Sequence, residues 1–262
     1  MGRVFKHDLW YEPAGQYRTL HVYLPNGYDD SEERYPVMYF FDGHNLFFDQ
    51  EATFGKSWGL KDFLDGWEKQ IIVVGMECSH EGNARLDEYC PYACHMFGHD
   101  ITPLGEQTFQ WLIQDVKDWV DTELRTWPHR EATGIGGSSM GGLMSLYGTI
   151  VHNDVFSKAA CLSTGLRVWK NRLSKELRSA HMYPDTRIYL SWGELEAGHT
   201  RKGADPQTES PEARATIPFA LQLGEAHVDT YLYFQPAGAH NEESWGWQNG
   251  RYLDYLWLDR RW

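Results

Sequence analysis

Short apolar runs alternate with longer segments of helical period along this chain, and that alternation constrains its fold more than any other feature. The runs have the length of β-strands and cover residues 17–24, 35–41, 70–76, 132–136, 158–162, 187–192 and 228–234. Within residues 109–124, apolar residues recur at the spacing of one buried helix face, and Pro128 ends the pattern. Strands that alternate with helices indicate a mostly parallel sheet covered by helices.

Two connections add detail to this prediction. The polar segment between the first two runs contains Asn26-Gly27 and an acidic tract, residues 29–33, so we expect a solvated loop that joins neighbouring antiparallel strands. The long polar insert at residues 197–211 is predicted to be a surface loop or part of the rim of a site. Because no repeat or linker interrupts the chain, residues 1–262 are predicted to form a single domain.

Charge and hydropathy exclude several classes of partner. The 262 residues include 37 acidic and 24 basic side chains, a net charge of −13, which disfavours binding to nucleic acid. No apolar stretch approaches the roughly 18–20 residues that span a bilayer, and the first residues lack a secretory signal, so we expect no membrane contact and a cytoplasmic location. The four cysteines do not form a disulfide framework and are predicted to be free thiols.

The most informative motif follows the run at residues 132–136. Gly137-Ser138-Ser139-Met140-Gly141 has the pattern Gly-x-Ser-x-Gly, and a helical segment comes after it. A serine on a sharp turn from strand to helix projects its hydroxyl into a site, while glycines at the flanking positions avoid collisions. The motif therefore predicts Ser139 as a nucleophile and the backbone N–H of Met140 as a donor to an oxyanion.

A serine hydroxyl needs a histidine as base and an acid that orients the histidine, and in this kind of turn they follow in the order Ser, acid, His. His240 lies on the loop after the last predicted strand and is the best candidate for the base. For the acid, the strand at residues 187–192 leads into two carboxylates, of which we prefer Glu196 to Glu194. Asp205 is a more distant alternative.

A second oxyanion donor is expected on the loop after an early buried strand. The run at residues 35–41 leads into Asp42-Gly43-His44-Asn45, where Gly43 permits a tight turn. The backbone N–H of His44 is the predicted donor. Its imidazole is predicted to form a wall of the pocket rather than a second base.

These segments together resemble the esterase family of the α/β-hydrolase superfamily, which includes feruloyl and acetyl-xylan esterases, siderophore esterases and S-formylglutathione hydrolases. The resemblance covers most of the chain and is carried by residues 42–47, 57–59, 85–89, 137–142 and 238–242, by Gly193 with Glu196, and by Trp245. It implies an α/β-hydrolase fold and a triad of Ser139, His240 and Glu196. It also suggests Trp58, Asn45 and Trp245 as substrate contacts.

The chain departs from that family at a few positions. Many relatives have glutamine at the position of His44 and aspartate at the position of Glu196, and the insert at residues 197–211 is long. These differences concern the shape of the pocket rather than the type of reaction.

The sequence thus predicts a cofactor-independent serine esterase for small acyl or aryl esters, on sugars or related scaffolds. Alternatives are a siderophore-ester or thioester hydrolase, an acyltransferase, and a non-catalytic binding module. No nucleotide-binding loop is present, and no metal is expected, because the set Cys90, Cys94, His95 and His99 is better explained as a packed loop than as a zinc site. The small-molecule ester is the expected partner, and the sequence leaves open whether the chain forms a homo-oligomer.

Overall fold

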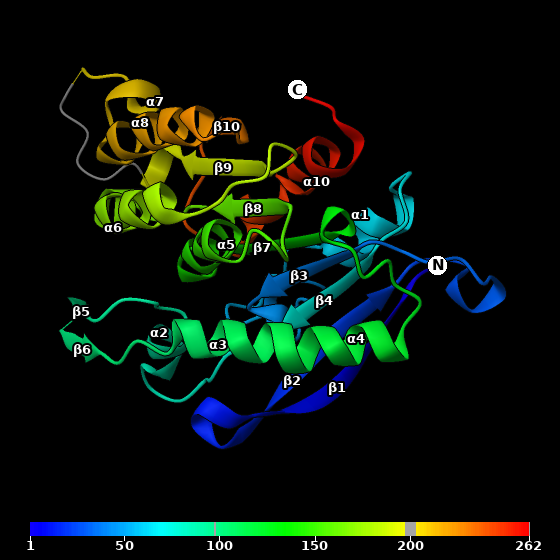
Figure 1. Cartoon of the computed structure of the whole chain (residues 1–262). Helices are drawn as coiled ribbons and strands as arrows, with labels where there is room; N and C mark the ends of the chain where they lie inside the picture. The colour runs from blue at the N-terminus through cyan, green and yellow to red at the C-terminus, as the bar shows by residue number, and fades with distance from the viewer. Residues whose placement is uncertain (97, 197–202, 262) are drawn as a thin grey trace. The chain divides into compact units, whose positions relative to one another are not determined.

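The computed structural model describes residues 1–96, 98–196 and 203–261 (Figure 1). The chain forms two compact units, Met1–Thr133 and Gly134–Trp262. None of the helices in the described ranges is long and apolar enough to cross a membrane.

In the first unit, the main sheet has the strand order β1-β2-β4-β3. β1 (Arg3–Tyr11) and β2 (Gln16–Leu24) form an antiparallel hairpin, β2 pairs antiparallel with β4 (Ile72–Met76), and β4 pairs parallel with β3 (Val37–Phe41). β3 and β4 are buried along their whole length, as expected for apolar runs inside a sheet.

One expectation about this unit was wrong. β2 and β3 run antiparallel, but they are not neighbours, because β4 lies between them and pairs with both. Strand β1 was not predicted, since its residues alternate between exposed and partly buried positions and so give no continuous apolar run.

The helices of the first unit are short. They are α1 (Leu60–Gly66), α2 (Ala84–Glu88), α3 (Gly105–Trp111) and α4 (Lys117–Glu123), and a π-helical segment, Leu112–Val116, makes α3 and α4 continuous. The predicted helix at residues 109–124 corresponds to this stretch, whose apolar positions Phe109, Leu112, Val116 and Val120 are fully buried. A small hairpin, β5 (Cys94–Met96) with β6 (His99–Ile101), completes the unit.

The second unit is a parallel α/β structure. Its strands are β7 (Thr133–Ser138), β8 (Lys158–Leu162), β9 (Arg187–Gly193) and β10 (Asp229–Gln235), and each pairs parallel with the next. The helices are α5 (Met140–Val151), α6 (Leu166–Ser179), α7 (Pro206–Glu209), α8 (Pro211–Glu225), α9 (Glu242–Gly246) and α10 (Asn249–Leu258).

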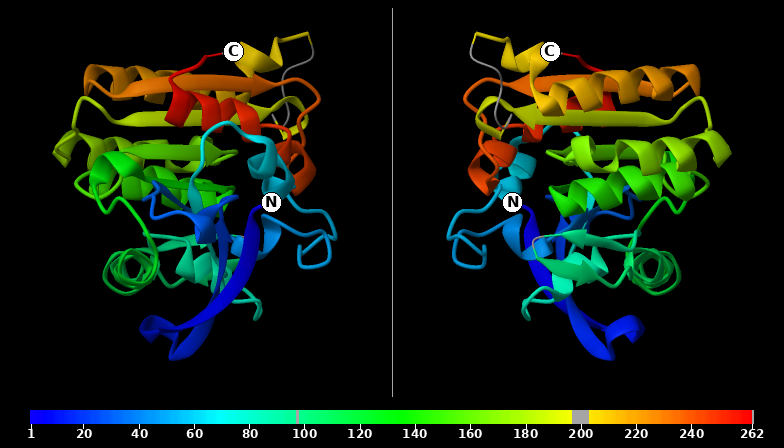
Figure 2. Two further views of the ribbon diagram at one scale, coloured as in Figure 1. Left: turned by 90° about the vertical axis from the view of Figure 1, so that its right-hand side faces the viewer. Right: turned by 90° about the vertical axis from the view of Figure 1, so that its left-hand side faces the viewer.

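Helices cover both faces of this second sheet. Helices α5, α6 and α8 pack together on one face, and α10 packs against β8 and β9 on the other (Figure 2). Because the four strands are parallel, the loops after β7, β8, β9 and β10 all leave the same edge of the sheet, where ligands usually bind in open α/β structures.

Candidate active site

Ser139 occupies a strained turn between β7 and α5. Its backbone has φ 55° and ψ −122°, a conformation that residues other than glycine rarely adopt. Two hydrogen bonds fix the turn, one from the N–H of Ser139 to the carbonyl of Leu162 at 2.9 Å and one from the N–H of Leu143 to the carbonyl of Ser139 at 2.9 Å. A strained, well-held conformation of this kind is typical of functional residues.

The turn needs a glycine at position 137. A Cβ atom on Gly137 would lie 2.7 Å from the carbonyl carbon of Gly141, closer than packed atoms come. Strand and helix therefore approach each other closely at the motif, as the sequence predicted on steric grounds. The next residue, Met140, begins helix α5, whose first N–H groups have no partner within the helix.

His240 and Glu196 form a hydrogen-bonded pair. Nδ1 of His240 lies 2.7 Å from Oε2 of Glu196. His240 is on the loop that follows β10, and Asn241 ends that loop by accepting a hydrogen bond from the N–H of Ser244 at 3.0 Å, which caps α9. Glu196 belongs to a 3₁₀ turn, Glu194–Glu196, that follows β9. The Glu196 side chain is 13% exposed and the His240 side chain 47% exposed.

The second carboxylate oxygen of Glu196 is also held. Oε1 accepts hydrogen bonds from the hydroxyl of Ser163 at 2.6 Å and from the N–H of Gly193 at 2.8 Å. Nε1 of Trp245 donates to the same Ser163 hydroxyl at 2.9 Å, and the indole ring meets the His240 imidazole edge to face, 5.0 Å between centroids. These contacts fix the orientation of the carboxylate, and through it that of the imidazole.

The two other acids considered from the sequence have different partners. Glu194 is exposed, and its Oε2 accepts from the N–H of Ala237 at 2.8 Å. Asp205 caps α7, where its Oδ1 accepts from the N–H of Gln207 at 3.0 Å. Residues 197–202 of the predicted insert lie outside the described residues, and its remainder includes Asp205 and α7.

Within the described residues, no hydrogen bond joins the hydroxyl of Ser139 to the imidazole of His240. Such contacts are often long in free enzymes and shorten when substrate binds.

The other predicted site residues lie in the first unit. His44 and Asn45 belong to a 3₁₀ turn, Gly43–Asn45, after β3, and both are buried. The N–H of Trp58 donates to the carbonyl of Asn45 at 2.9 Å, and the buried indole of Trp58 packs edge to face on Phe40. The structure thus brings Asn45 and Trp58 together, while their role toward a substrate stays a prediction.

Sequence reasoning missed Ser163. A signal was available, because Ser163 follows β8 just as Ser139 follows β7 and Glu194 follows β9, at the carboxyl ends of adjacent parallel strands. Ser163 also has a positive φ, 51°, which an isolated sequence does not reveal.

Comparisons with known proteins define the family. The family model described as "Putative esterase" matches residues 12–249, so the chain belongs to this esterase family. A curated relative, the uncharacterized protein YbbA of Bacillus subtilis strain 168, is 24% identical over 195 residues, 73% of this chain and 73% of that protein.

Solved structures give the same fold. An IroE-like serine hydrolase from Shewanella oneidensis has a TM-score of 0.73 at 18% identity and covers 97% of this chain and 81% of its own. A ferulic acid esterase has a TM-score of 0.67 at 16% identity and covers 98% of both chains. The predicted fold class, an α/β-hydrolase with a mainly parallel sheet flanked by helices, is confirmed.

Proposed function

We propose that this member of the esterase family is a serine esterase that acts through an acyl-enzyme. The hydrogen bond between His240 and Glu196 carries the proposal, together with the strained turn that presents Ser139. Glu196 fixes the imidazole with its proton on Nδ1, which leaves Nε2 free to act as a base. The name of one structural neighbour, a serine hydrolase, is in keeping with this mechanism.

In the proposed reaction, His240 takes the proton of Ser139 as the hydroxyl oxygen attacks the ester carbonyl. The backbone N–H groups of Met140 and His44 stabilise the oxyanion, and the protonated imidazole then gives its proton to the leaving alcohol. A water molecule, activated by the same imidazole, hydrolyses the acyl-enzyme. Because nearly half of the His240 side chain is exposed, water can reach it, as hydrolysis of the acyl-enzyme requires.

We propose a small acyl or aryl ester as the substrate, on a sugar or related scaffold. The support is the family resemblance and a neighbour named as a ferulic acid esterase. Acetyl, butyryl, feruloyl, thioester and siderophore substrates, assayed side by side, would identify the preferred class. Product analysis with competing sugar acceptors would distinguish an acyltransferase, which must yield acylated acceptor in excess of free acid.

The proposed nucleophile is tested by Ser139→Ala. Hydrolysis of p-nitrophenyl acetate should fall by at least about 10⁴-fold, because the residual rate of enzymes that lack their nucleophile comes from binding and the oxyanion hole alone. A fluorophosphonate probe should label wild type and not the variant. Ser138→Ala is the matched control, since it removes the neighbouring hydroxyl and keeps the proposed nucleophile, and it should still be labelled. Near wild-type hydrolysis by folded Ser139→Ala would exclude the mechanism.

A further inference from the structure

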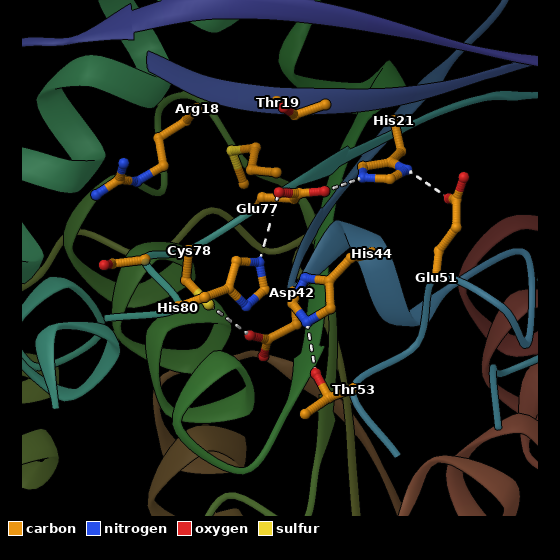
Figure 3. Close-up of polar contacts among 12 residues, drawn as sticks. Arg18, Thr19, His21, Asp42, His44, Glu51, Thr53, Glu77, Cys78 and His80 are labelled. Atoms are coloured by element: carbon orange, nitrogen blue, oxygen red, sulfur yellow. Dashed lines mark hydrogen bonds and ion pairs between the residues drawn. The ribbon is translucent and has the colours of Figure 1, made fainter. Parts of the chain in front are cut away.

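A compact group of potential metal ligands lies in the first unit and includes no residue of the proposed triad. One ligand atom from each of His44, Glu77 and His80 lies within 4.8 Å of the other two (Figure 3). Among the described residues, no other three histidine, cysteine or acidic side chains meet this condition. We propose that His44, Glu77 and His80 bind a zinc ion, with solvent as the fourth ligand.

Strand pairing explains why these residues meet. β3 and β4 are parallel neighbours in which Phe41 pairs with Met76, so the segments that carry His44 and Glu77 leave the sheet side by side. The turn at Gly43 rests on β4, because a Cβ atom on Gly43 would lie 2.3 Å from the carbonyl carbon of Gly75. This close approach, which only glycine allows, brings the His44 imidazole to the loop that starts with Glu77.

The His44 imidazole is prepared to act as a ligand. The residue is 5% exposed, and its Nε2 lies 2.9 Å from the hydroxyl of Thr53. Nδ1 is buried and has no hydrogen-bond partner among the residues that the structure describes. Burial lowers the pKa of His44, and His80 adds to this effect while Asp42 opposes it. If Nε2–H donates to Thr53, Nδ1 presents a lone pair that a metal ion would satisfy.

Glu77 is held in place as an anionic ligand. Its Oε1 lies 2.5 Å from Nε2 of the fully buried His21, whose Nδ1 is 3.3 Å from the carboxylate of Glu51. Although burial opposes ionisation, the hydrogen bond with His21 and the three nearby imidazoles of His21, His44 and His80 lower the pKa of Glu77. The ionised carboxylate gives the site negative charge, and a buried outer partner of this kind orients metal ligands in proteins.

The third ligand closes the site from the solvent side. Nε2 of His80 lies 3.5 Å from Oε2 of Glu77, and its ring meets the His44 ring edge to face, 4.6 Å between centroids. The His80 side chain is 57% exposed, so it can rotate, and an ion can enter past it. Ligand atoms about 2.0–2.1 Å from zinc stand about 3.3 Å apart in a tetrahedron. Glu77 and His80 are already near this spacing, at 3.5 Å, and rotation of the exposed His80 side chain would bring the group together around an ion.

The donor set favours a transition metal. Two imidazole nitrogens and one carboxylate with an open position suit zinc, and the same set also binds iron(II), whereas calcium and magnesium require mainly oxygen ligands. The ligand is the imidazole of His44, while the oxyanion role proposed above uses its backbone N–H. The zinc proposal therefore stands independently of the esterase mechanism.

This group is different from the segment with Cys90, Cys94, His95 and His99, which was considered as a zinc site from the sequence. The thiol of Cys90 is buried and donates to the carbonyl of Tyr92 at 3.2 Å, and His95 pairs with Asp100 at 2.9 Å. No metal is expected from the sequence, and the spacing of residues 44, 77 and 80 matches no metal-binding motif.

Metal binding is tested directly on the untagged protein. After treatment with a chelator and dialysis, zinc is titrated in competition with a chromophoric chelator, and cobalt(II) is used as a spectroscopic probe. We expect about one zinc per chain, and a cobalt absorption band of the intensity typical of tetrahedral sites. His80→Ala should weaken zinc binding by more than about 100-fold, which exceeds the 10–100-fold effect of losing an outer partner. Wild-type affinity in this variant would overturn the proposal.

Two further variants separate ligation from structure. Thr53→Val removes the hydroxyl next to Nε2 of His44 and should weaken zinc binding by about 10–100-fold without abolishing it. His95→Ala is the matched control, since it also removes an exposed imidazole with a carboxylate partner, and it should bind zinc like wild type. If His95→Ala loses zinc while His80→Ala keeps it, the ion binds in the cysteine-containing segment and the proposed site is wrong.

Discussion

At the scale of single residues, the candidate site distinguishes two neighbouring carboxylates. Glu194 and Glu196 follow the same strand and belong to one 3₁₀ turn, yet Glu196 contacts the imidazole of His240 and Glu194 contacts a backbone N–H. If the proposed mechanism holds, only one of them should matter for the chemical step.

We expect Glu196→Gln to lower kcat by about 10⁴-fold, because an amide at this position can stabilise the wrong tautomer of the imidazole and carries no charge. Glu194→Gln is the control. It keeps an oxygen that can accept from the N–H of Ala237, so kcat should stay close to the wild-type value. Steady-state kinetics with p-nitrophenyl acetate measure both. Equal losses in the two variants would contradict the assignment of the acid.

The sequence alone could name both carboxylates and favoured Glu196, but it could not show which of the two side chains turns toward His240. Their side chains differ in direction because the turn after β9 places Oε1 of Glu196 on the N–H of Gly193 and on the hydroxyl of Ser163. Ser163 comes from another strand, and no local pattern connects it to Glu196. By contrast, the turn at Ser139 could be predicted, because its glycine requirement is local.

At the scale of elements, apolar runs predicted the buried strands well. β8 begins and ends at the predicted residues, and the other predicted strands differ from the observed bounds by one or two residues. Strand order in the first unit was not predictable in the same way. β4 is inserted between β2 and β3 although it follows both along the chain, and only long-range pairing determines this.

Helix α6 illustrates a long-range contact that stabilises an element. Its N-cap residue is Gly165, which has no side chain to accept from the first N–H groups. Glu212, on α8, supplies the acceptor instead, with Oε1 2.7 Å from the N–H of Leu166. Burial raises the pKa of this carboxyl, and hydrogen bonds from the N–H groups of Leu166 and Arg167 oppose the rise. The contact therefore joins the ends of two helices.

We expect Glu212→Ala to lower the free energy of unfolding by about 1–3 kcal/mol, the usual effect of leaving a buried donor unsatisfied. Glu212→Gln keeps an oxygen acceptor and should lose less. Urea denaturation followed by circular dichroism provides the measurement. Glu225→Ala, at the exposed end of the same helix, is the control and should change stability by less than about 0.5 kcal/mol. A comparable loss in the control would show that charge on α8, rather than the contact, is responsible.

At the scale of the whole molecule, folding brings together groups that no motif relates. His44, Glu77 and His80 lie on two loops, and their meeting depends on the pairing of β3 with β4 and on the contact between Gly43 and Gly75. The triad candidates could be found in the sequence because they occur in a known order along the chain. The proposed zinc site could not, because only the folded structure brings its three residues together.

A buried ion pair in the first unit also makes the stability of the chain depend on pH. Asp42 follows β3 in a left-handed conformation, φ 58°, and accepts two hydrogen bonds from Arg85, both at 2.7 Å. Burial opposes ionisation of Asp42, but the guanidinium outweighs it and holds the pKa of this carboxyl below its ordinary value. The Asp42 side chain is 8% exposed and the Arg85 side chain 30% exposed.

The sign of the pH effect follows from this depressed pKa. In the unfolded chain the pKa of this carboxyl is about 3.9. Below about pH 5 the unfolded state therefore begins to bind more protons than the folded state. The contribution of the pair is fully present above that range and is lost as the pH falls through the pKa of the folded state. The free energy of unfolding of the wild type should therefore decrease steeply between pH 5 and the lowest pH at which the protein stays folded.

Asp42→Asn should remove part of that dependence. Asparagine tolerates the left-handed backbone, so the variant loses mainly the negative charge. Its free energy of unfolding at pH 7 should be lower by about 2–4 kcal/mol, slightly less than the loss expected when a fully buried ion pair is broken. Urea denaturation at several values between pH 7 and pH 3 should give curves for wild type and variant that converge on acidification, because protonated Asp42 no longer attracts Arg85. Asp30→Asn, at an exposed carboxylate, should instead follow the wild-type curve. A constant difference between Asp42→Asn and wild type at every pH would mean that packing, and not the ion pair, accounts for the loss.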